Sequence, residues 1–407
     1  MPYRVLMLFI CIVLLVSTTT YAEDNPHLVV ASVENSNVLV WRTGVASPTR
    51  YAIPESVSGN PRQLVISSDG QYVVLNSAYP ASLWMVTPTD KNLVELVPNQ
   101  ALPTMDDPKF LQIGNLQRGA NNTFYFNTAN HPSHYTLQNN DLWQADAPSR
   151  TFKLVLPPSE GGLFNLSPDG QHIAIAQSGS YGETDGKISL VDTAGQNRQD
   201  VLSFPAVSTA SDYDFYPTLF WLADSSAFKV AIPDKELVYH DDSALTSLWQ
   251  IATDGTKTQI GSVQASFFGL PQWSDNGEHL IYLRHKGDIT SNQFELMVAA
   301  GDGTHPTVYA NGLAGSIGFP QWLPKSDRFI YSQGEAGDYW LGQPNQPPQR
   351  LPGKVFNPHF VDNTTYVFTT ASGDAFEIRY ARLGETSSTL VATVHNPVPI
   401  FDAAVIP

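Results

Sequence analysis

The sequence predicts an all-β fold, a β-propeller of four-stranded antiparallel blades whose ring is closed by strands from both chain ends. Three observations support this prediction. A strand-turn-strand motif recurs along the chain, two further short strands follow most copies of it, and the copies are about 40 to 50 residues apart, which is typical of propeller blades. No helical periodicity of comparable strength competes with this pattern.

The recurring motif is a hairpin. Its clearest copies are residues 64–75 (LVISSDGQYVVL), 163–176 (LFNLSPDGQHIAIA) and 271–282 (PQWSDNGEHLIY). Degenerate copies occupy residues 219–230, 320–331 and 358–368, while residues 110–126 keep only its outline. An apolar strand enters, proline's fixed φ and glycine's tolerance of positive φ favour a tight turn, and a strand rich in β-branched and aromatic residues leaves.

Two more strands complete each predicted blade. Examples of the third strand are residues 82–86 (SLWMV), 187–191 (KISLV) and 247–251 (SLWQI), and polar turns such as residues 254–256 (DGT) precede a final short strand. The eight tryptophans fall mostly on strand positions, which favours packing between blades over ligand contact.

The blade count follows from the turns. Those near residues 69, 118, 169, 225, 276, 326 and 363 define seven units. Strands at residues 28–33, 38–41 and 50–53 lack an entering strand, which the C-terminal residues 399–406 can supply. Eight blades are therefore favoured, and seven is the alternative if residues 110–142 elaborate a neighbouring unit. Closure by both ends would leave no long exposed edge strand.

The hairpin motif resembles the TolB-type propeller repeat, also called the WD40-like or PD40 repeat. The best copies are residues 166–176, 273–282 and 322–331, each with a strand after the turn. The resemblance implies the propeller fold, and it implies function only weakly, because such propellers serve as periplasmic interaction modules, as substrate gates of peptidases and as lyases. Relatives with peptidase activity carry a C-terminal hydrolase domain, for which the propeller pattern leaves no room here.

Residues 1–22 are expected to be a cleaved signal peptide. Arg4 precedes twelve apolar residues at 5–16, and Thr20 and Ala22 provide small side chains before Glu23. Twelve apolar residues are too few for a membrane span, which needs about 20. We therefore expect one propeller domain at residues 23–407, secreted or periplasmic, without membrane insertion after cleavage and without the single cysteine, Cys11.

Charge excludes one class of partner. The chain has 22 basic and 38 acidic residues, a net charge of −16, and loss of Arg4 with the signal peptide makes it more negative. No basic run offsets this acidity, so nucleic acid is excluded as a partner. Glycine-rich phosphate loops, EF-hand loops and His-Glu-x-x-His helices are also missing from the sequence, so no cofactor and no metal site is expected.

The candidate site comes from loops. Turns of an antiparallel blade alternate between its two ends, so insertions after the second strand and connections between blades should gather on one face, here called the loop face. Insertions at residues 127–141, 178–186, 233–246 and 285–292 and the connection at 203–217 all obey this rule. The candidate binding residues on them are His131, His134, Tyr135, Tyr181, Asp212, Tyr213, Asp214, Phe215, Tyr216, His240, Asp241 and Asp242.

These residues leave three functions open. Rigid scaffolds with long loops on one face favour a non-catalytic binding module for a protein or peptide. Aromatic and acidic groups such as those at residues 211–216 can alternatively stack on the sugar rings of glycans or cell-wall fragments. A stand-alone lyase or hydrolase would need convergent titratable groups, here several aspartates and the histidines His131, His134, His240 and His285. The sequence identifies no catalytic residue.

Overall fold

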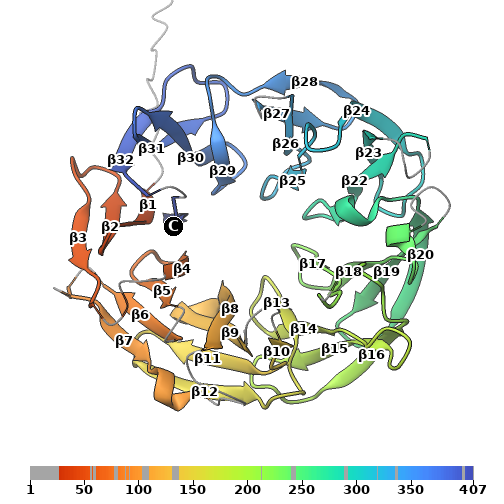
Figure 1. Ribbon diagram of the computed structural model, residues 1–407, viewed down its shortest axis with the longest axis horizontal. Coiled ribbons are helices and arrows are strands. Elements are labelled where there is room, and N and C mark those ends of the chain that lie inside the picture. The colour runs from red at the N-terminus through yellow and green to blue at the C-terminus, as the bar shows by residue number, and fades with distance from the viewer. Residues whose placement is uncertain are drawn as a thin grey trace, which may run out of the picture.

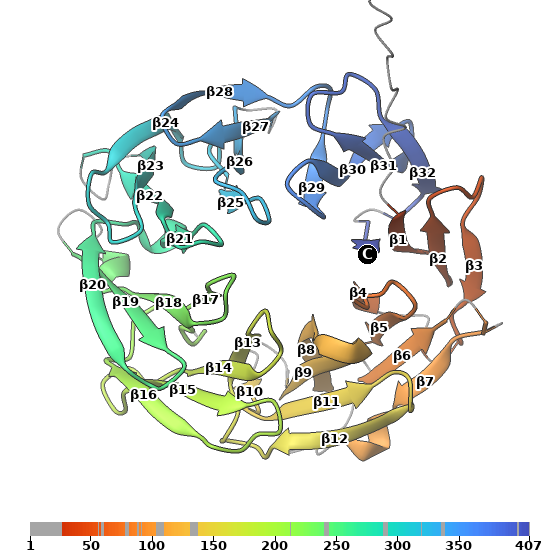
Figure 2. The ribbon, with the colours of Figure 1, turned by 180° about the vertical axis from the view of Figure 1, so that it is seen from behind.

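The predicted hairpins pair into eight antiparallel sheets that follow one another around a ring, as Figures 1 and 2 show from its two faces. The structure, a computed structural model, describes residues 27–55, 57, 61–77, 81–87, 89–90, 92–102, 110–130, 137–211, 213–239, 244–287, 292–318, 320–334, 338–396 and 399–406. Seven sheets have four strands and the remaining one has five. The eight-blade propeller is thus confirmed, and the seven-blade alternative is wrong.

Blade 1 uses both chain ends. Its strands, from the innermost outward, are β33 (Phe401–Ile406), β1 (His27–Glu34), β2 (Asn37–Arg42) and β3 (Thr49–Ala52). In the antiparallel pairing of β1 with β33, His27 lies opposite Ile406 and Ser32 lies opposite Phe401. The C-terminal strand therefore supplies the missing inner strand, and closure of the ring by the two ends is confirmed.

Blades 2 to 4 follow in chain order. Blade 2 consists of β4 (Pro61–Ile66), β5 (Val73–Ser77), β6 (Ser82–Val86) and β7 (Val94–Val97). Blade 3 consists of β8 (Leu111–Arg118), β9 (Thr123–Asn130), the short β10 (Leu137–Gln138), β11 (Leu142–Asp146) and β12 (Thr151–Leu156). Blade 4 consists of β13 (Leu163–Leu166), β14 (His172–Gln177), β15 (Gly186–Asp192) and β16 (Gln199–Phe204).

Blades 5 to 8 repeat the same order. Blade 5 has β17 (Leu219–Trp221), β18 (Ala227–Ile232), β19 (Thr246–Ala252) and β20 (Lys257–Val263). Blade 6 has β21 (Gln272–Trp273), β22 (His279–His285), β23 (Gln293–Ala300) and β24 (Thr307–Leu313). Blade 7 has β25 (Gln321–Trp322), β26 (Phe329–Gln333), β27 (Asp338–Gln343) and β28 (Gln346–Arg350). Blade 8 has β29 (Phe356–Phe360), β30 (Thr365–Ser372), β31 (Ala375–Arg382) and β32 (Thr389–Val394).

Helical structure within the described ranges is limited to single 3-10 turns: η1 (Asn99–Ala101), η3 (Ala120–Asn122), η4 (Leu237–Tyr239) and η5 (Phe267–Gly269). In this part of the chain no helix has the length and apolar character that a membrane crossing requires. Residues 1–26 lie outside the described residues, so the predicted signal peptide and its cleavage site stay predictions.

The hairpin turn has one recurring geometry. In blade 4 the Ser167 hydroxyl donates to Asp169 Oδ1 at 2.6 Å and accepts from the His172 backbone N–H at 2.9 Å. Gly170 follows with φ of +68°, a left-handed conformation that glycine adopts without a steric penalty. Residues 67–72 and 274–279 repeat both hydrogen bonds. The repeated Ser-x-Asp-Gly sequence, with Asn276 in place of the aspartate in blade 6, therefore encodes this turn.

The apolar core is divided among the blade interfaces. Buried residues of the described chain form eight clusters, and each cluster joins two neighbouring blades, including blades 8 and 1. All eight tryptophans lie on strands and none is exposed. The indole N–H of Trp221 donates to the Asn165 carbonyl at 3.0 Å, and that of Trp322 donates to the Gln272 carbonyl at 2.9 Å, each across a blade interface. The prediction that the tryptophans pack between blades is confirmed.

Candidate functional site

Loops of blades 4 and 5 meet at a hollow on the loop face, with a volume of about 470 Å³. Its lining comes from the loop after β14, the connection from β16 to β17 and the loop after β18. The residues that line it are Ser178, Gly179, Tyr181, Val207, Ser208, Thr209, Ala210, Ser211, Tyr213, Asp214, Phe215 and Tyr239. We call it the loop-face hollow.

Hydrogen bonds join the three segments. The Tyr181 hydroxyl donates to Glu236 Oε1 at 3.1 Å, which links the loop after β14 to the loop after β18. The Ser208 hydroxyl donates to the Tyr239 hydroxyl at 3.3 Å, which links the connection to η4. These segments come from two blades, and they lie together as the alternation of turns predicts.

The hollow has an exposed aromatic rim. Tyr213, Tyr181 and Tyr239 expose 62%, 53% and 51% of their surfaces, whereas Phe215 exposes only 8% and packs in the core between blades 4 and 5. The Phe215 ring lies 6.1 Å from that of Phe267 in η5, and the neighbouring Phe268 is 61% exposed. The buried Phe215 thus connects the loop-face hollow to η5, whose exposed Phe268 lines a separate hollow.

Two tyrosine hydroxyls of this region are perturbed. Burial, together with the nearby charge of Asp214, raises the pKa of Tyr216 to about 12. The pKa of Tyr181 is also raised, mainly because its hydroxyl donates to the Glu236 carboxylate. Both phenols therefore stay protonated at neutral pH, and the Tyr181 hydroxyl keeps its proton for the hydrogen bond to Glu236.

The structure places five of the twelve candidate residues here. Tyr181, Tyr213, Asp214 and Phe215 line the loop-face hollow, and Tyr216 directly follows them. The other seven lie outside the described residues: His131, His134, Tyr135, Asp212, His240, Asp241 and Asp242. Whether any of the twelve binds a ligand stays a prediction.

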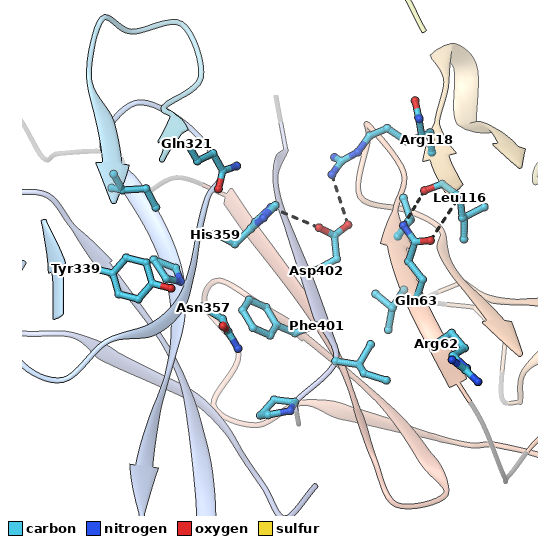
Figure 3. Close-up of a pocket in the computed structure, with 17 residues that line it drawn as sticks. Arg62, Gln63, Leu116, Arg118, Gln321, Tyr339, Asn357, His359, Phe401 and Asp402 are labelled. Carbon is cyan, nitrogen blue, oxygen red and sulfur yellow. Dashed lines mark hydrogen bonds and ion pairs between the residues drawn. The ribbon is translucent and has the colours of Figure 1, made fainter. Parts of the chain in front are cut away.

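A second hollow lies at the centre of the ring and was not predicted. It has a volume of about 800 Å³ and is lined by residues of blades 1, 2, 3, 7 and 8, most of them on or next to inner strands (Figure 3). We call it the channel hollow. Its charged and imidazole side chains are Arg62, Arg118, His359 and Asp402.

Asp402 of the C-terminal strand connects four blades in this hollow. Its Oδ2 accepts a hydrogen bond from the Ile66 backbone N–H at 2.8 Å and lies 3.4 Å from an Arg118 guanidinium nitrogen. Its Oδ1 lies 3.5 Å from His359 Nε2. Figure 3 shows the carboxylate between the arginine and the histidine.

The sequence contained a signal for this hollow. The C-terminal segment was predicted to be the innermost strand of blade 1, and Asp402 is the only charged residue within its apolar run, residues 399–406. An isolated acid on an inner strand needs a partner when it is buried. Its partners could not be predicted, because they come from three other blades.

Among the described residues, no group of three or more histidine, cysteine, aspartate or glutamate side chains could hold a metal ion. The histidine pair His131 and His134 lies outside this part of the chain.

Comparisons with known proteins support the fold. No protein-family model matches the chain, and a search of curated proteins finds no match. The structure of a eukaryotic initiation factor has 9% sequence identity and a TM-score of 0.51, over 92% of this chain and 100% of that one. A prolyl endopeptidase has 15% identity and a TM-score of 0.48, over 70% of this chain and only 43% of its own length.

TolB from Acinetobacter baumannii is also among the similar structures, with 9% identity and a TM-score of 0.36, over 92% of this chain and 66% of that one. Of these three matches only that to the initiation factor has a TM-score above 0.5, and at such low identity it supports the fold alone. The TolB-type repeat stays a resemblance carried by the turn motifs.

Proposed function

We propose that this chain is an exported β-propeller that binds a positively charged segment of a protein or peptide at the loop-face hollow. The observation that carries the proposal is the exposed aromatic rim. Tyr181, Tyr213 and Tyr239 surround a hollow that two blades build together. Large aromatic side chains on a surface are costly to leave in water, and they are enriched where proteins bind one another.

Charge favours a cationic partner. Within the described parts of the three loop segments, the acids Glu183, Asp185, Asp214, Asp234 and Glu236 accompany a single basic residue, Lys235. A Lys or Arg side chain can lie over a tyrosine face while its charge is attracted to nearby carboxylates. The acidity of the whole chain would in addition speed the approach of such a partner.

The scaffold suits this role because it is rigid beneath the loops. Phe215 packs against the core and anchors the connection that carries Tyr213. The Thr209 hydroxyl donates to the Tyr213 carbonyl at 2.6 Å, which restrains the backbone of the same segment. Restraint before binding reduces the entropy that a partner must overcome.

The proposal is tested with fluorescent octapeptides of matched composition that are cationic, neutral or anionic. We expect the purified protein to bind the cationic set and Tyr213→Ala or Tyr181→Ala to weaken that binding about tenfold, as truncation of a central interface aromatic does. Leu390→Ala, which truncates an exposed apolar residue on the outer strand β32, is the matched control and should change nothing.

Two other results would contradict the proposal, one for the class of ligand and one for the site. Binding of neutral oligosaccharides, lost in Tyr213→Ala, with no binding of cationic peptides, would replace the peptide with a glycan. Cationic binding that both tyrosine variants leave unchanged would show that the loop-face hollow is not the site.

A further inference from the structure

A third hollow opens on the loop face, where the inner strands of blades 5, 6 and 7 begin. Strands β17, β21 and β25 follow one another around the centre of the ring in Figure 2, and the residues just before each of them contribute to its wall. The hollow has a volume of about 470 Å³. We call it the η5 hollow. The apolar side chains that line it are Phe220, Phe267, Phe268, Leu270, Pro271 and Pro320.

The turn η5 holds Phe268 in a fixed position at this hollow. The Ser266 hydroxyl accepts the Phe268 backbone N–H at 3.3 Å, and the Ser266 carbonyl accepts the Gly269 N–H at 3.0 Å. The Ser266 N–H in turn donates to the Leu283 carbonyl of β22 at 2.7 Å, which ties the turn to blade 6. Phe268 is nevertheless 61% exposed. A rigid turn therefore presents a large aromatic side chain to solvent.

Exposed apolar side chains are concentrated around the η5 hollow and the loop-face hollow. Within the described ranges, every large apolar or tyrosine side chain that is more than half exposed lies on the loop face of blades 4 to 6. An exposed apolar surface confined to one side of a molecule is typical of a docking surface for another protein. The side chains concerned are Tyr181, Tyr213, Tyr239, Leu245, Phe268 and Leu313.

The η5 hollow differs in charge from the loop-face hollow. None of its described lining residues carries a charge. The segments around the loop-face hollow, in contrast, contain acids such as Asp214, Asp234 and Glu236. Removing a charged group from water without a partner charge is costly. A basic side chain therefore suits the loop-face hollow, and an uncharged apolar side chain suits the η5 hollow.

The two hollows share a wall. Phe215 lines the loop-face hollow and Phe267 lines the η5 hollow, and their ring centroids are 6.1 Å apart. Both rings pack in the core cluster between blades 4 and 5. An extended chain advances about 3.3 Å per residue, so a few residues of one partner segment are enough to reach from one hollow to the other.

We propose that the η5 hollow is a second docking site on the loop face, and that it takes an apolar side chain, Phe, Trp or Leu, from the same partner whose basic residue occupies the loop-face hollow. This inference rests on the proposed function, because it assigns both hollows to one partner. The partner is a protein segment in which a basic and an apolar residue lie a few positions apart. Phe268 contacts the apolar side chain at the edge of the hollow.

Four fluorescent octapeptides in a neutral Gly/Ser background test this inference. The first has a Lys and a Phe about three residues apart, in either order, which matches the shared wall. The others replace Lys with Gln, Phe with Ser, or both. We expect Phe to strengthen binding about tenfold or more over Ser, the scale of burying an aromatic side chain. Phe268→Ala should remove most of this gain and keep the gain from Lys, whereas Tyr213→Ala should do the reverse.

Two further variants make the comparison specific. Thr218→Asp places a carboxylate on the exposed wall of the η5 hollow without altering η5, and it should also remove the gain from Phe. Val308→Ala truncates an exposed apolar residue on the outer strand β24 of blade 6, and it should preserve both gains.

The outcomes separate this inference from the proposed function. A gain from Lys with no gain from Phe, or a gain from Phe that survives both Phe268→Ala and Thr218→Asp, overturns the inference alone. A gain from Phe without one from Lys contradicts the proposed function and the assignment of both hollows to one partner. Failure of all four peptides to bind overturns both proposals. Sedimentation velocity tests the other occupant, because a dimer that Phe268→Ala dissociates would place a second copy of the chain in the hollow and overturn the inference.

Discussion

Asp141 shows how a single buried carboxylate joins the two described ends of the insertion of blade 3. It is fully buried, and it accepts hydrogen bonds from the Thr128 backbone N–H at 2.8 Å, the Thr128 hydroxyl at 2.5 Å and the Trp143 indole N–H at 2.8 Å. Burial raises the pKa of Asp141 in spite of these bonds. The end of a segment that the sequence assigns to a binding loop is therefore part of the core.

Replacement of Asp141 should change the pH dependence of stability. Because its pKa is higher in the folded protein, the unfolded chain loses this proton first, so the group lowers stability as pH rises above its ordinary value of 3.8. Asp141→Asn removes that effect. Urea unfolding between pH 4 and 7 should show the stability of the variant improving, relative to the unaltered protein, as pH rises.

Asp69 provides a control of opposite sign. Although burial alone would raise the pKa of Asp69, hydrogen bonds from the Gln71 backbone, Ser67 and Asn122 lower it. Its contribution to stability is therefore present above pH 3.8 and is lost as pH falls through the lower folded value. Asp69→Asn should become less stable, relative to the unaltered protein, as pH rises. If both variants respond in the same direction, one of the two pKa directions is wrong.

At the scale of the element, the hairpin turn was predictable because its chemistry is local. Ser167, Asp169 and Gly170 lie within four residues of one another, and the hydrogen bonds that close the turn, from Ser167 and the Gln171 backbone to Asp169, need no distant partner. The register of the strand pairs was harder to predict from the sequence. In blades 2 to 8 the pairing of the third and fourth strands contains a register shift, for example between Leu248 and Trp249. Such bulges increase the local twist. A leucine or isoleucine precedes each shift, but these residues are common throughout the strands and do not identify a bulge by themselves.

Ser167→Ala should cost about 1 kcal/mol of unfolding free energy, the usual contribution of a hydrogen-bonded side chain. The change removes the donor to Asp169 and leaves the His172 backbone N–H without its acceptor. Denaturant titration measures the loss. Ser180→Ala, in an exposed loop of the same blade, should stay within about 0.5 kcal/mol of the unaltered protein, as surface substitutions usually do. Equal effects would show that the turn serine contributes nothing particular.

The two candidate sites also differ in how far apart their residues lie in the sequence, and this decided which of them could be predicted. The sequence identified Tyr181, Tyr213 and the insertion that carries Tyr239, because long insertions between strands are visible in the sequence itself, and the structure brings these loops together. The exposure of Phe268 was not predicted, because the apolar residues around it, including Phe267, are typical of a buried segment. The channel hollow was missed because Arg62, Arg118 and Asp402 are up to 340 residues apart, and only the closed ring makes them neighbours.

At the scale of the whole molecule, the ring depends on β33. Removal of residues 400–407 should expose the inner edge of β1 and take Asp402 away from Ile66, Arg118 and His359. We expect the truncated chain to melt at a lower temperature and to associate through the free strand edge. A synthetic peptide of residues 399–407 should restore the melting temperature, and a scrambled peptide should not. A truncated chain as stable as the full chain would show that closure by β33 contributes nothing to stability.

The same closure has a consequence for the order in which the protein folds. Partner strands within a blade are separated by short segments and can pair as soon as both are present, whereas β1 and β33 begin 374 residues apart. Bringing such distant segments together costs chain entropy that grows with the logarithm of their separation, and native pairing recovers it only at the end. The inner edge of β1 therefore stays unpaired until β33 has been synthesised and has docked. The slow step of folding should be this final docking, and a seven-blade ring with one incomplete blade is the intermediate that precedes it.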